Sequence, residues 1–241
     1  MNNRSLLIDN LHKVRDQIAA AAKRSGRPAG AVKLIAVTKY VTADLARQLA
    51  AAGCQDLGES RPQELWSKAE SLRDFLSDQN STNQIRWHLI GHLQRNKIDR
   101  TLPLVSLIHS GDSLRLLEAI NHAAASANRC IPILIEINIS GDTTKHGFVP
   151  EEVEPNLQKI ALLSSLEIRG LMTMAGREGD LDQARREFNA LRQLRDKLAR
   201  AAPPNVDLAE LSMGMSGDFE VAIEEGATIV RIGSALFEGL A

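Results

Sequence analysis

The chain has 241 residues, of which 44% are hydrophobic and 24% charged, and its formal net charge is −1. This composition is typical of a globular protein with a substantial core, and it lacks the charge blocks of proteins that bind nucleic acid or membrane surfaces. No apolar run approaches the ~20 residues that span a bilayer, and the N-terminus leads into an amphipathic pattern rather than a signal sequence. The two cysteines, Cys54 and Cys130, form no CxxC pattern. We therefore expect a cytoplasmic protein in which both are reduced core residues.

Strand-like and helix-like segments alternate along the chain after a first amphipathic helix. In this helix Leu7 and Leu11 lie on the apolar face, and the pattern ends near Gly26. A near-continuous apolar run then leads to Lys39, and a second helix is predicted to begin after Thr42 as its N-cap. Further strand candidates follow with helical patterns between them. The predicted strands are residues 32–38, 56–58, 87–90, 105–108, 131–137, 168–172, 207–211 and 228–232.

Eight strand–helix units in a chain close to the ~250 residues of a typical eight-stranded α/β barrel predict one closed parallel barrel. No linker or low-complexity tract divides the chain. We therefore predict a single α/β domain over residues 1–241, a (β/α)8 TIM barrel with an extra N-terminal helix. The alternative is a doubly wound open sheet, which needs fewer of these strands to be real.

Lys39 is a charged residue at the end of the first predicted strand. The carboxyl ends of the strands are where α/β folds carry their chemistry, so a lysine at this position is a candidate functional residue. The alternative is a lysine whose ammonium group simply extends to solvent from a strand end.

Small polar residues follow the seventh and eighth predicted strands, the two positions whose loops commonly bind phosphate in barrels. Gly233 would let a phosphate approach the backbone, and Ser234 offers a hydroxyl and an amide at the start of a short helix. Ser212 could add a second hydroxyl. The alternative is that Gly214 serves a tight turn and Ser234 only caps the helix.

A lysine, a phosphate-binding loop and Arg231 at one barrel mouth suit pyridoxal 5′-phosphate (PLP). PLP sites pair a lysine that forms a Schiff base with an Asp or Arg facing the pyridine nitrogen. An arginine there disfavours ring protonation and so weakens the ring as an electron sink. A Schiff-base aldolase acting on a sugar phosphate needs the same lysine and phosphate site, and it remains an alternative.

Six motifs occur in chain order: Ala36-Val37-Thr38-Lys39, Gly58-Glu59-Ser60-Arg61, Trp87-His88-Leu89-Ile90-Gly91-His92-Leu93-Gln94-Arg95-Asn96-Lys97, Gly170-Leu171-Met172-Thr173-Met174, Leu211-Ser212-Met213-Gly214-Met215-Ser216, and Arg231-Ile232-Gly233-Ser234-Ala235-Leu236-Phe237. With them the chain resembles, over nearly its whole length, the pyridoxal phosphate homeostasis proteins, single barrels similar to the N-terminal domain of bacterial alanine racemase. The resemblance implies that Lys39 holds PLP as a Schiff base. It also implies that Ser212, Gly233 and Ser234 take the phosphate and that Arg231 faces the pyridine nitrogen.

Two positions depart from the family pattern. Ser60 stands where the family usually has asparagine, and Ser234 replaces a more usual threonine but keeps the hydroxyl. His88, in a strand pattern, either lies beside the cofactor ring or packs in the core. The predicted cofactor-binding residues are Lys39, Ser60, His88, Ser212, Met213, Gly214, Arg231, Gly233 and Ser234.

We predict neither a metal site nor a serine hydrolase site. His88 and His92 are four residues apart, but His88 lies in a strand pattern and no Glu follows it, so a zinc site there is not expected. The segment from Gly214 to Asp218 nearly matches GxSxG, but Asp218 replaces the last glycine.

The resemblance implies a PLP-binding protein of intracellular PLP (vitamin B6) homeostasis rather than an enzyme, so we assign no catalytic residue. Alanine racemases use a second base, a tyrosine from a second domain, and we expect the chain to lack that domain. The single tyrosine, Tyr40, is expected to point away from Lys39, because neighbours in an extended stretch alternate. A low-activity PLP-dependent amino-acid racemase remains an alternative. We expect a monomer that binds PLP and has PLP-dependent apo-enzymes as partners.

Overall fold

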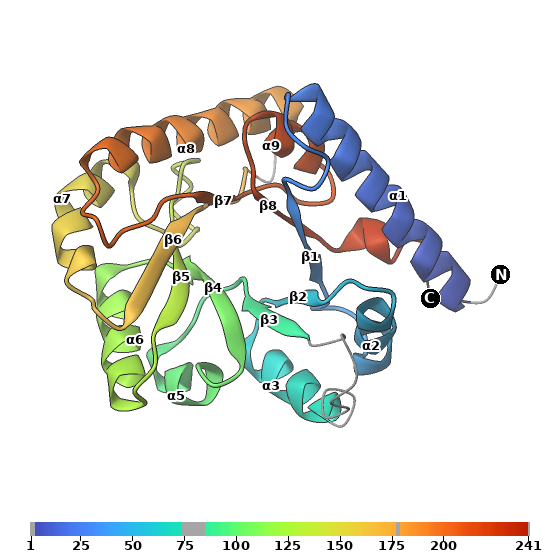
Figure 1. The fold of residues 1–241 in the computed structure, drawn as a ribbon, viewed down its shortest axis with the longest axis horizontal. Coiled ribbons are helices and arrows are strands. Elements are labelled where there is room, and N and C mark those ends of the chain that lie inside the picture. The colour runs from blue at the N-terminus through green and yellow to red at the C-terminus, as the bar shows by residue number, and fades with distance from the viewer. Residues whose placement is uncertain (1–2, 74–84, 177–178, 241) are drawn as a thin grey trace.

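The strands of the protein form one closed parallel barrel in chain order, β1 to β8, as the computed structural model shows for residues 3–73, 85–176 and 179–240 (Figure 1). β8 pairs with β1 and closes the ring. The predicted (β/α)8 barrel with an extra N-terminal helix is confirmed, and the open sheet is excluded. The strands are β1 Lys33–Val37, β2 Asp56–Glu59, β3 Arg86–Leu89, β4 Val105–Gly111, β5 Ile131–Glu136, β6 Leu166–Met172, β7 Glu210–Ser212 and β8 Ile229–Ile232.

Helices alternate with the strands and surround the barrel (Figure 1). Thr42 caps α2 as predicted, because its side chain accepts a hydrogen bond from the Leu45 amide. The helices are α1 Asn3–Arg24, α2 Ala43–Ala51, α3 Pro62–Ser71, α5 Ile98–Thr101, α6 Leu114–Ser126, α7 Pro150–Ala161, α8 Leu181–Ala201 and α9 Phe219–Glu224, with the 3-10 turns η1 Arg95–Lys97 and η2 Ser234–Leu236.

Helix α1 lies against the C-terminal elements α9 and η2 (Figure 1). Its apolar face, with Leu7 and Leu11 fully buried, belongs to the main core. The Asn10 amide donates to the carbonyl oxygens of Leu236 at 3.2 Å and Glu238 at 2.9 Å. The extra helix therefore joins the two ends of the chain and supports the loop that follows β8.

Side chains on the barrel strands alternate between two environments. The outward residues pack against the helices in a large apolar core, whereas the inside holds a small apolar cluster that includes Ile35 and Met172. Polar side chains occupy other buried positions on the strands: Asp56, His88, His109, Ser212 and Arg231. A polar group buried in a barrel must be hydrogen-bonded, so these residues need partners inside the protein.

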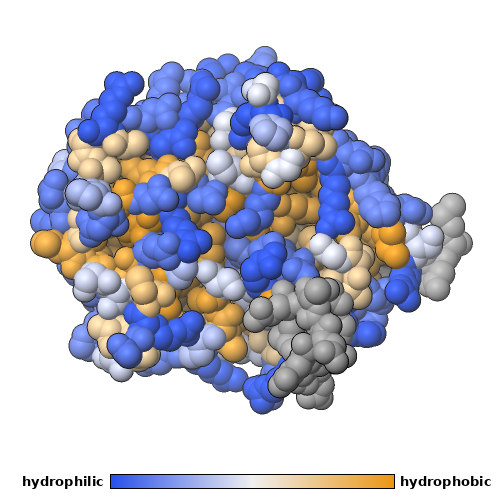
Figure 2. Space-filling model, in the orientation of Figure 1, coloured by the Kyte–Doolittle hydropathy of each residue, from blue (hydrophilic) through white to orange (hydrophobic). Residues whose placement is uncertain are grey.

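Hydrophilic residues dominate the rim of the face seen in Figure 2, and apolar residues show between them toward its middle. Among the residues that the structure describes, no helix is long and apolar enough to cross a membrane. Cys54 and Cys130 are both free thiols, and Cys54 is buried as expected. The expectation is wrong for Cys130, which is exposed because it lies in the connection between α6 and β5 rather than in either element.

Candidate functional site

Lys39 lies in the turn after β1, exposed at the carboxyl-end mouth of the barrel. Directly before it, Thr38 is buried and its hydroxyl donates to Glu59 Oε1 at 2.6 Å. Lys68 Nζ, from α3, donates to the Thr38 carbonyl oxygen at 2.5 Å and to Glu59 Oε1 at 2.6 Å. Three elements thus hold the backbone that carries Lys39 through one buried ion pair.

Tyr40 does not point away from Lys39. The Nζ of Lys39 lies 4.9 Å from the centroid of the Tyr40 ring, which is 87% exposed. The expected alternation fails because the chain is not extended here: the Val41 amide donates to the Thr38 carbonyl oxygen at 3.1 Å and closes a turn.

The loops after β7 and β8 meet at Ser216. Its Oγ accepts hydrogen bonds from the backbone amides of Gly233 at 3.2 Å and Ala235 at 3.4 Å. Ser234, between them in sequence, is exposed. Two amides and the Ser216 hydroxyl therefore meet in what we call the amide cradle, formed by Ser216, Gly233, Ala235 and the exposed Ser234 between them. Such a set of donors suits an anion.

Ser216 was not among the predicted cofactor-binding residues, although it belongs both to a family motif and to the near-match to GxSxG. The signal was available: Ser216 lies in the glycine-containing loop after the seventh strand, next to the predicted loop of Gly233 and Ser234.

Met213 and Gly214 do not present side chains to the cradle. Met213 is fully buried in the core between barrel and helices, and its predicted contact with the cofactor stays a prediction. Gly214 has φ +95°, and an added Cβ would lie 2.6 Å from the Cβ of Ala222. Its carbonyl oxygen accepts from the Arg231 amide at 3.0 Å, which ties the β7 loop to β8. Gly214 thus serves a turn, the alternative considered from the sequence.

A chain of hydrogen bonds crosses the inside of the barrel from Arg231 to Asp56. Arg231 Nη1 lies 2.7 Å from Ser212 Oγ, which lies 2.8 Å from His109 Nδ1. His109 Nε2 lies 3.0 Å from His88 Nδ1, and His88 Nε2 lies 2.9 Å from Asp56 Oδ1. We call these five residues the barrel relay. Every inward polar side chain of the set thereby has a partner.

The two ends of the relay determine the direction of every proton in it. Arg231 can only donate and an ionised Asp56 can only accept, so with both histidines neutral each link donates toward Asp56. Burial lowers the pKa of His88 and lowers that of His109 well below its usual value, which keeps both rings neutral. Burial alone would raise the pKa of Asp56, but hydrogen bonds from Arg86 and His88 outweigh it and hold that pKa well below its usual range.

Two of the predicted cofactor-binding residues, His88 and Ser212, are members of the relay. His88 packs in the core with both ring nitrogens hydrogen-bonded, which is one of its two predicted roles. Ser212 is fully buried, and its oxygen accepts from Arg231 while its proton goes to His109. In the structure Ser216 is hydrogen-bonded to the loop of Gly233, and a phosphate contact of Ser212 stays a prediction.

Arg231 is a buried cation held in place at the base of the mouth. Its Nη2 also donates to the Thr173 carbonyl oxygen at 2.9 Å, and burial lowers its pKa to about 10, so it remains protonated at neutral pH. Glu136, at the end of β5, is buried as well; burial raises its pKa to about 7, with Asp112 adding to this shift and Arg231 opposing it.

Ser60 lies half-buried at the mouth, directly after β2. The next loop packs closely on it, since a Cβ added at Gly91 would lie 2.3 Å from the Ser60 carbonyl oxygen. Of the predicted cofactor-binding residues, the structure thus brings together Lys39, Ser60, Gly233 and Ser234 at the mouth, with Arg231 beneath it.

A parallel barrel with a lysine after its first strand and an amide cradle after its last two is the arrangement expected of a protein of the alanine racemase barrel class. Consistent with this, the family model described as alanine racemase, N-terminal domain, matches residues 9–240. A pyridoxal phosphate homeostasis protein of Aquifex aeolicus is 40% identical over 229 residues, which cover 95% of this chain and 96% of that protein. The chain belongs to the family of pyridoxal phosphate homeostasis proteins.

Two solved structures share the whole fold. A protein of unknown function from Bifidobacterium adolescentis is similar with a TM-score of 0.91 and 40% identity, covering 98% of this chain and 96% of that one. PipY from Synechococcus elongatus PCC7942, with PLP bound, is similar with a TM-score of 0.83 and 32% identity, covering 96% of this chain and 99% of that one.

Proposed function

We propose that this protein binds pyridoxal 5′-phosphate through a covalent bond to Lys39 and serves the homeostasis of that cofactor in the cell. The proposal rests on the proximity of the turn that carries Lys39 to the amide cradle. β1 pairs with β8, with Ala36 opposite Ile232, and a Cβ added at Gly233 would lie 3.4 Å from the Val37 carbonyl oxygen. Lys39 and the cradle are therefore on adjacent loops.

The residues present fit the chemical groups of PLP. Lys39 supplies the amine for its aldehyde, and the amides of Gly233 and Ala235 with the hydroxyls of Ser216 and Ser234 would bind its phosphate. Arg231 would donate to the pyridine nitrogen. When bound, PLP supplies a reactive aldehyde and a ring that can accept electrons.

Binding rather than turnover is favoured by two features of this chain. The buried Arg231 is a fixed cation, and a hydrogen-bond donor at the pyridine nitrogen disfavours ring protonation and so weakens the ring as an electron sink. Tyr40, the single tyrosine of the chain, contacts Lys39 itself and so lies on the same side of any molecule bound to Lys39. Racemisation needs an acid on the opposite side.

The proposal also covers where the protein acts, its oligomeric state and its partners. We propose a cytoplasmic monomer whose partners are PLP-dependent apo-enzymes. The PLP held by PipY favours this function over an aldolase, which would bind a sugar phosphate with the same lysine and cradle.

Borohydride reduction of the purified protein tests the proposal. We expect the protein to absorb as a PLP adduct, and reduction should fix one PLP on the peptide that contains Lys39. Lys39→Arg keeps the charge but removes the reactive amine, and it should carry no label, whereas the matched variant Lys145→Arg should be labelled like the wild type. A label on another lysine, or no PLP at all, would contradict the proposal. Conversion of L-alanine to D-alanine at the usual enzyme rates of ~1–10³ per second would contradict the carrier role.

A further inference from the structure

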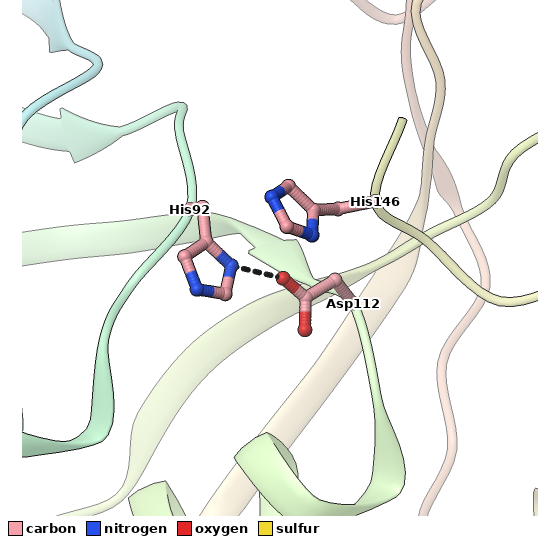
Figure 3. A group of neighbouring side chains, drawn as sticks. All are labelled: His92, Asp112 and His146. Carbon is pink, nitrogen blue, oxygen red and sulfur yellow. Dashed lines mark hydrogen bonds and ion pairs between the residues drawn. The ribbon is translucent and has the colours of Figure 1, made fainter. Parts of the chain in front are cut away.

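Three side chains from three different loops converge at the mouth of the barrel: His92 after β3, Asp112 after β4, and His146 between β5 and α7 (Figure 3). One ligand atom of each lies within 4.8 Å of the others. His92 Nδ1 is 2.6 Å from Asp112 Oδ2, and the two imidazole rings stack with centroids 4.2 Å apart and planes at 14°. The carboxylate is buried and both rings are exposed, so the group is open to solvent on one side.

We propose that His92, Asp112 and His146 bind a divalent transition metal ion of the zinc type. Two imidazole nitrogens and a carboxylate oxygen form a ligand set that zinc uses in proteins, with a fourth position left open to water or another molecule. Ligand atoms of a tetrahedral zinc site with bonds of about 2.1 Å lie about 3.4 Å apart. Without an ion, the ligand atoms of the three side chains already lie within 4.8 Å of one another, and both rings are exposed.

The loop that carries His146 is anchored on both sides of this residue. Before it, Lys145 Nζ donates to the carbonyl oxygens of Met174 and Ala175 at 3.2 and 3.1 Å. After it, the Phe148 amide donates to the Glu136 carbonyl oxygen at 2.8 Å, which ties the loop to the end of β5. His146 is therefore held over the mouth by fixed points on its own loop.

The other two ligands are also supported. The hydroxyl of Ser110, on β4, donates to the carbonyl oxygen of Gly91 at 2.7 Å and so fixes the residue next to His92. Asp112 Oδ1 accepts from the Ser113 hydroxyl at 3.0 Å, which orients the carboxylate. Hydrogen bonds of this kind around the ligands are what metal sites use to orient them.

This site shares no residue with the groups proposed to hold PLP, although Gly91, next to His92, packs on Ser60. Asp112 follows β4, which lies across the eight-stranded ring from β8 and its cradle. The metal proposal does not rest on PLP binding, and a failure of one leaves the other standing. From the sequence, His92 was weighed as a metal ligand only together with His88, which lies inside the barrel. Its partners in the structure, Asp112 and His146, lie much further along the chain.

Zinc titration of the full chain, stripped of metal by EDTA and competed against a chromophoric chelator, tests the proposal. We expect one zinc ion per chain. Loss of one ligand in His92→Ala or His146→Ala should weaken binding by at least about a hundredfold, because even changes around the ligands cost 10–100-fold. The matched control is His122→Ala, which removes an exposed histidine of α6 outside the group and should bind zinc like the wild type.

A second measurement on the wild type does not depend on how the variants fold. Cobalt(II) added in place of zinc should give visible absorption bands of a four- or five-coordinate ion and shifted NMR signals from two imidazole rings. Absence of stoichiometric zinc binding by the wild type would overturn the proposal. So would zinc affinities of His92→Ala and His146→Ala equal to that of His122→Ala, or a cobalt spectrum of the purely hydrated ion.

Discussion

The amide cradle is formed by individual polar groups of Ser216, Gly233, Ser234 and Ala235. The amides of Gly233 and Ala235 both point at one oxygen, Ser216 Oγ, and so mark a place where an anionic oxygen would be bound by the same donors. Ser234 is exposed beside them. Charge matters more than size at such a place, because hydrogen bonds to a charged group contribute roughly 1.5–3 kcal/mol each.

Replacement of Ser234 by aspartate should therefore impair PLP binding, whereas asparagine, of the same size but neutral, should impair it much less. We expect Ser234→Asp to weaken binding at least about tenfold to a hundredfold, since the carboxylate replaces a donor and repels the phosphate. Equilibrium titration of both variants with PLP measures this. Equal affinity of Ser234→Asp and Ser234→Asn would show that the phosphate is bound elsewhere.

At the scale of elements, β1, β2 and α3 are joined beneath Lys39 by the buried pair of Lys68 and Glu59. Lys68 contacts both the carboxylate of β2 and the carbonyl oxygen at the end of β1. Among the described residues, Glu59 Oε2 has no hydrogen-bond partner, so the carboxylate depends on the cation. Removing one member of a buried pair leaves an uncompensated charge, which costs about 3–5 kcal/mol.

Lys68→Met should lower the free energy of unfolding by about 3–5 kcal/mol, because it leaves the buried Glu59 carboxylate without its counter-ion. The double variant Lys68→Met with Glu59→Gln should recover much of this loss. Lys197→Met, which makes the same substitution in an exposed pair with Glu154, should cost no more than ~1 kcal/mol. Urea unfolding followed by circular dichroism compares them, and similar losses for Lys68→Met and Lys197→Met would contradict the anchoring role.

At the scale of the whole molecule, the polar interior makes stability depend on pH in two opposite ways. His88 and His109 have lowered pKa values in the folded state, so below about 6.5 the unfolded chain binds more protons and stability falls as the pH falls. Glu136 acts in the other direction, because its pKa is raised from 4.5 to about 7. The stability associated with its protonated form is present below pH 4.5 and is lost as the pH rises through 7.

Glu136→Gln separates these contributions. At pH 8 we expect the variant to be more stable than the wild type by up to about 3 kcal/mol, the free energy of a pKa shift of this size. The difference should disappear as the pH falls toward 4.5, so the variant loses stability in acid more steeply than the wild type. Urea unfolding across this range, with EDTA present, checks the trend. A difference that does not change with pH would mean that Glu136 does not titrate in this window.

Patterns along the chain were sufficient for the fold and for part of the site. Alternation of strand-like and helix-like segments predicted the eight strands, and the first of them was the clearest because a strand of a parallel barrel is buried on both faces. Lys39, Gly233 and Ser234 were predicted as site residues because all strands of such a barrel end at one mouth, so residues that follow them lie near one another. The family motifs then distinguished PLP from other phosphate ligands.

The tertiary structure decided which side of each strand a residue occupies and which distant residues meet. Ser212, the last residue of β7, lies inside the barrel, whereas Met213, directly after it, lies in the outer core and Ser216 is part of the amide cradle. Local periodicity cannot distinguish them, because inward and outward positions depend on the register and tilt of the whole ring. The barrel relay and the group of His92, Asp112 and His146 arise in the same way. They are assembled only when closure of the barrel brings strands and loops from separate parts of the chain into contact.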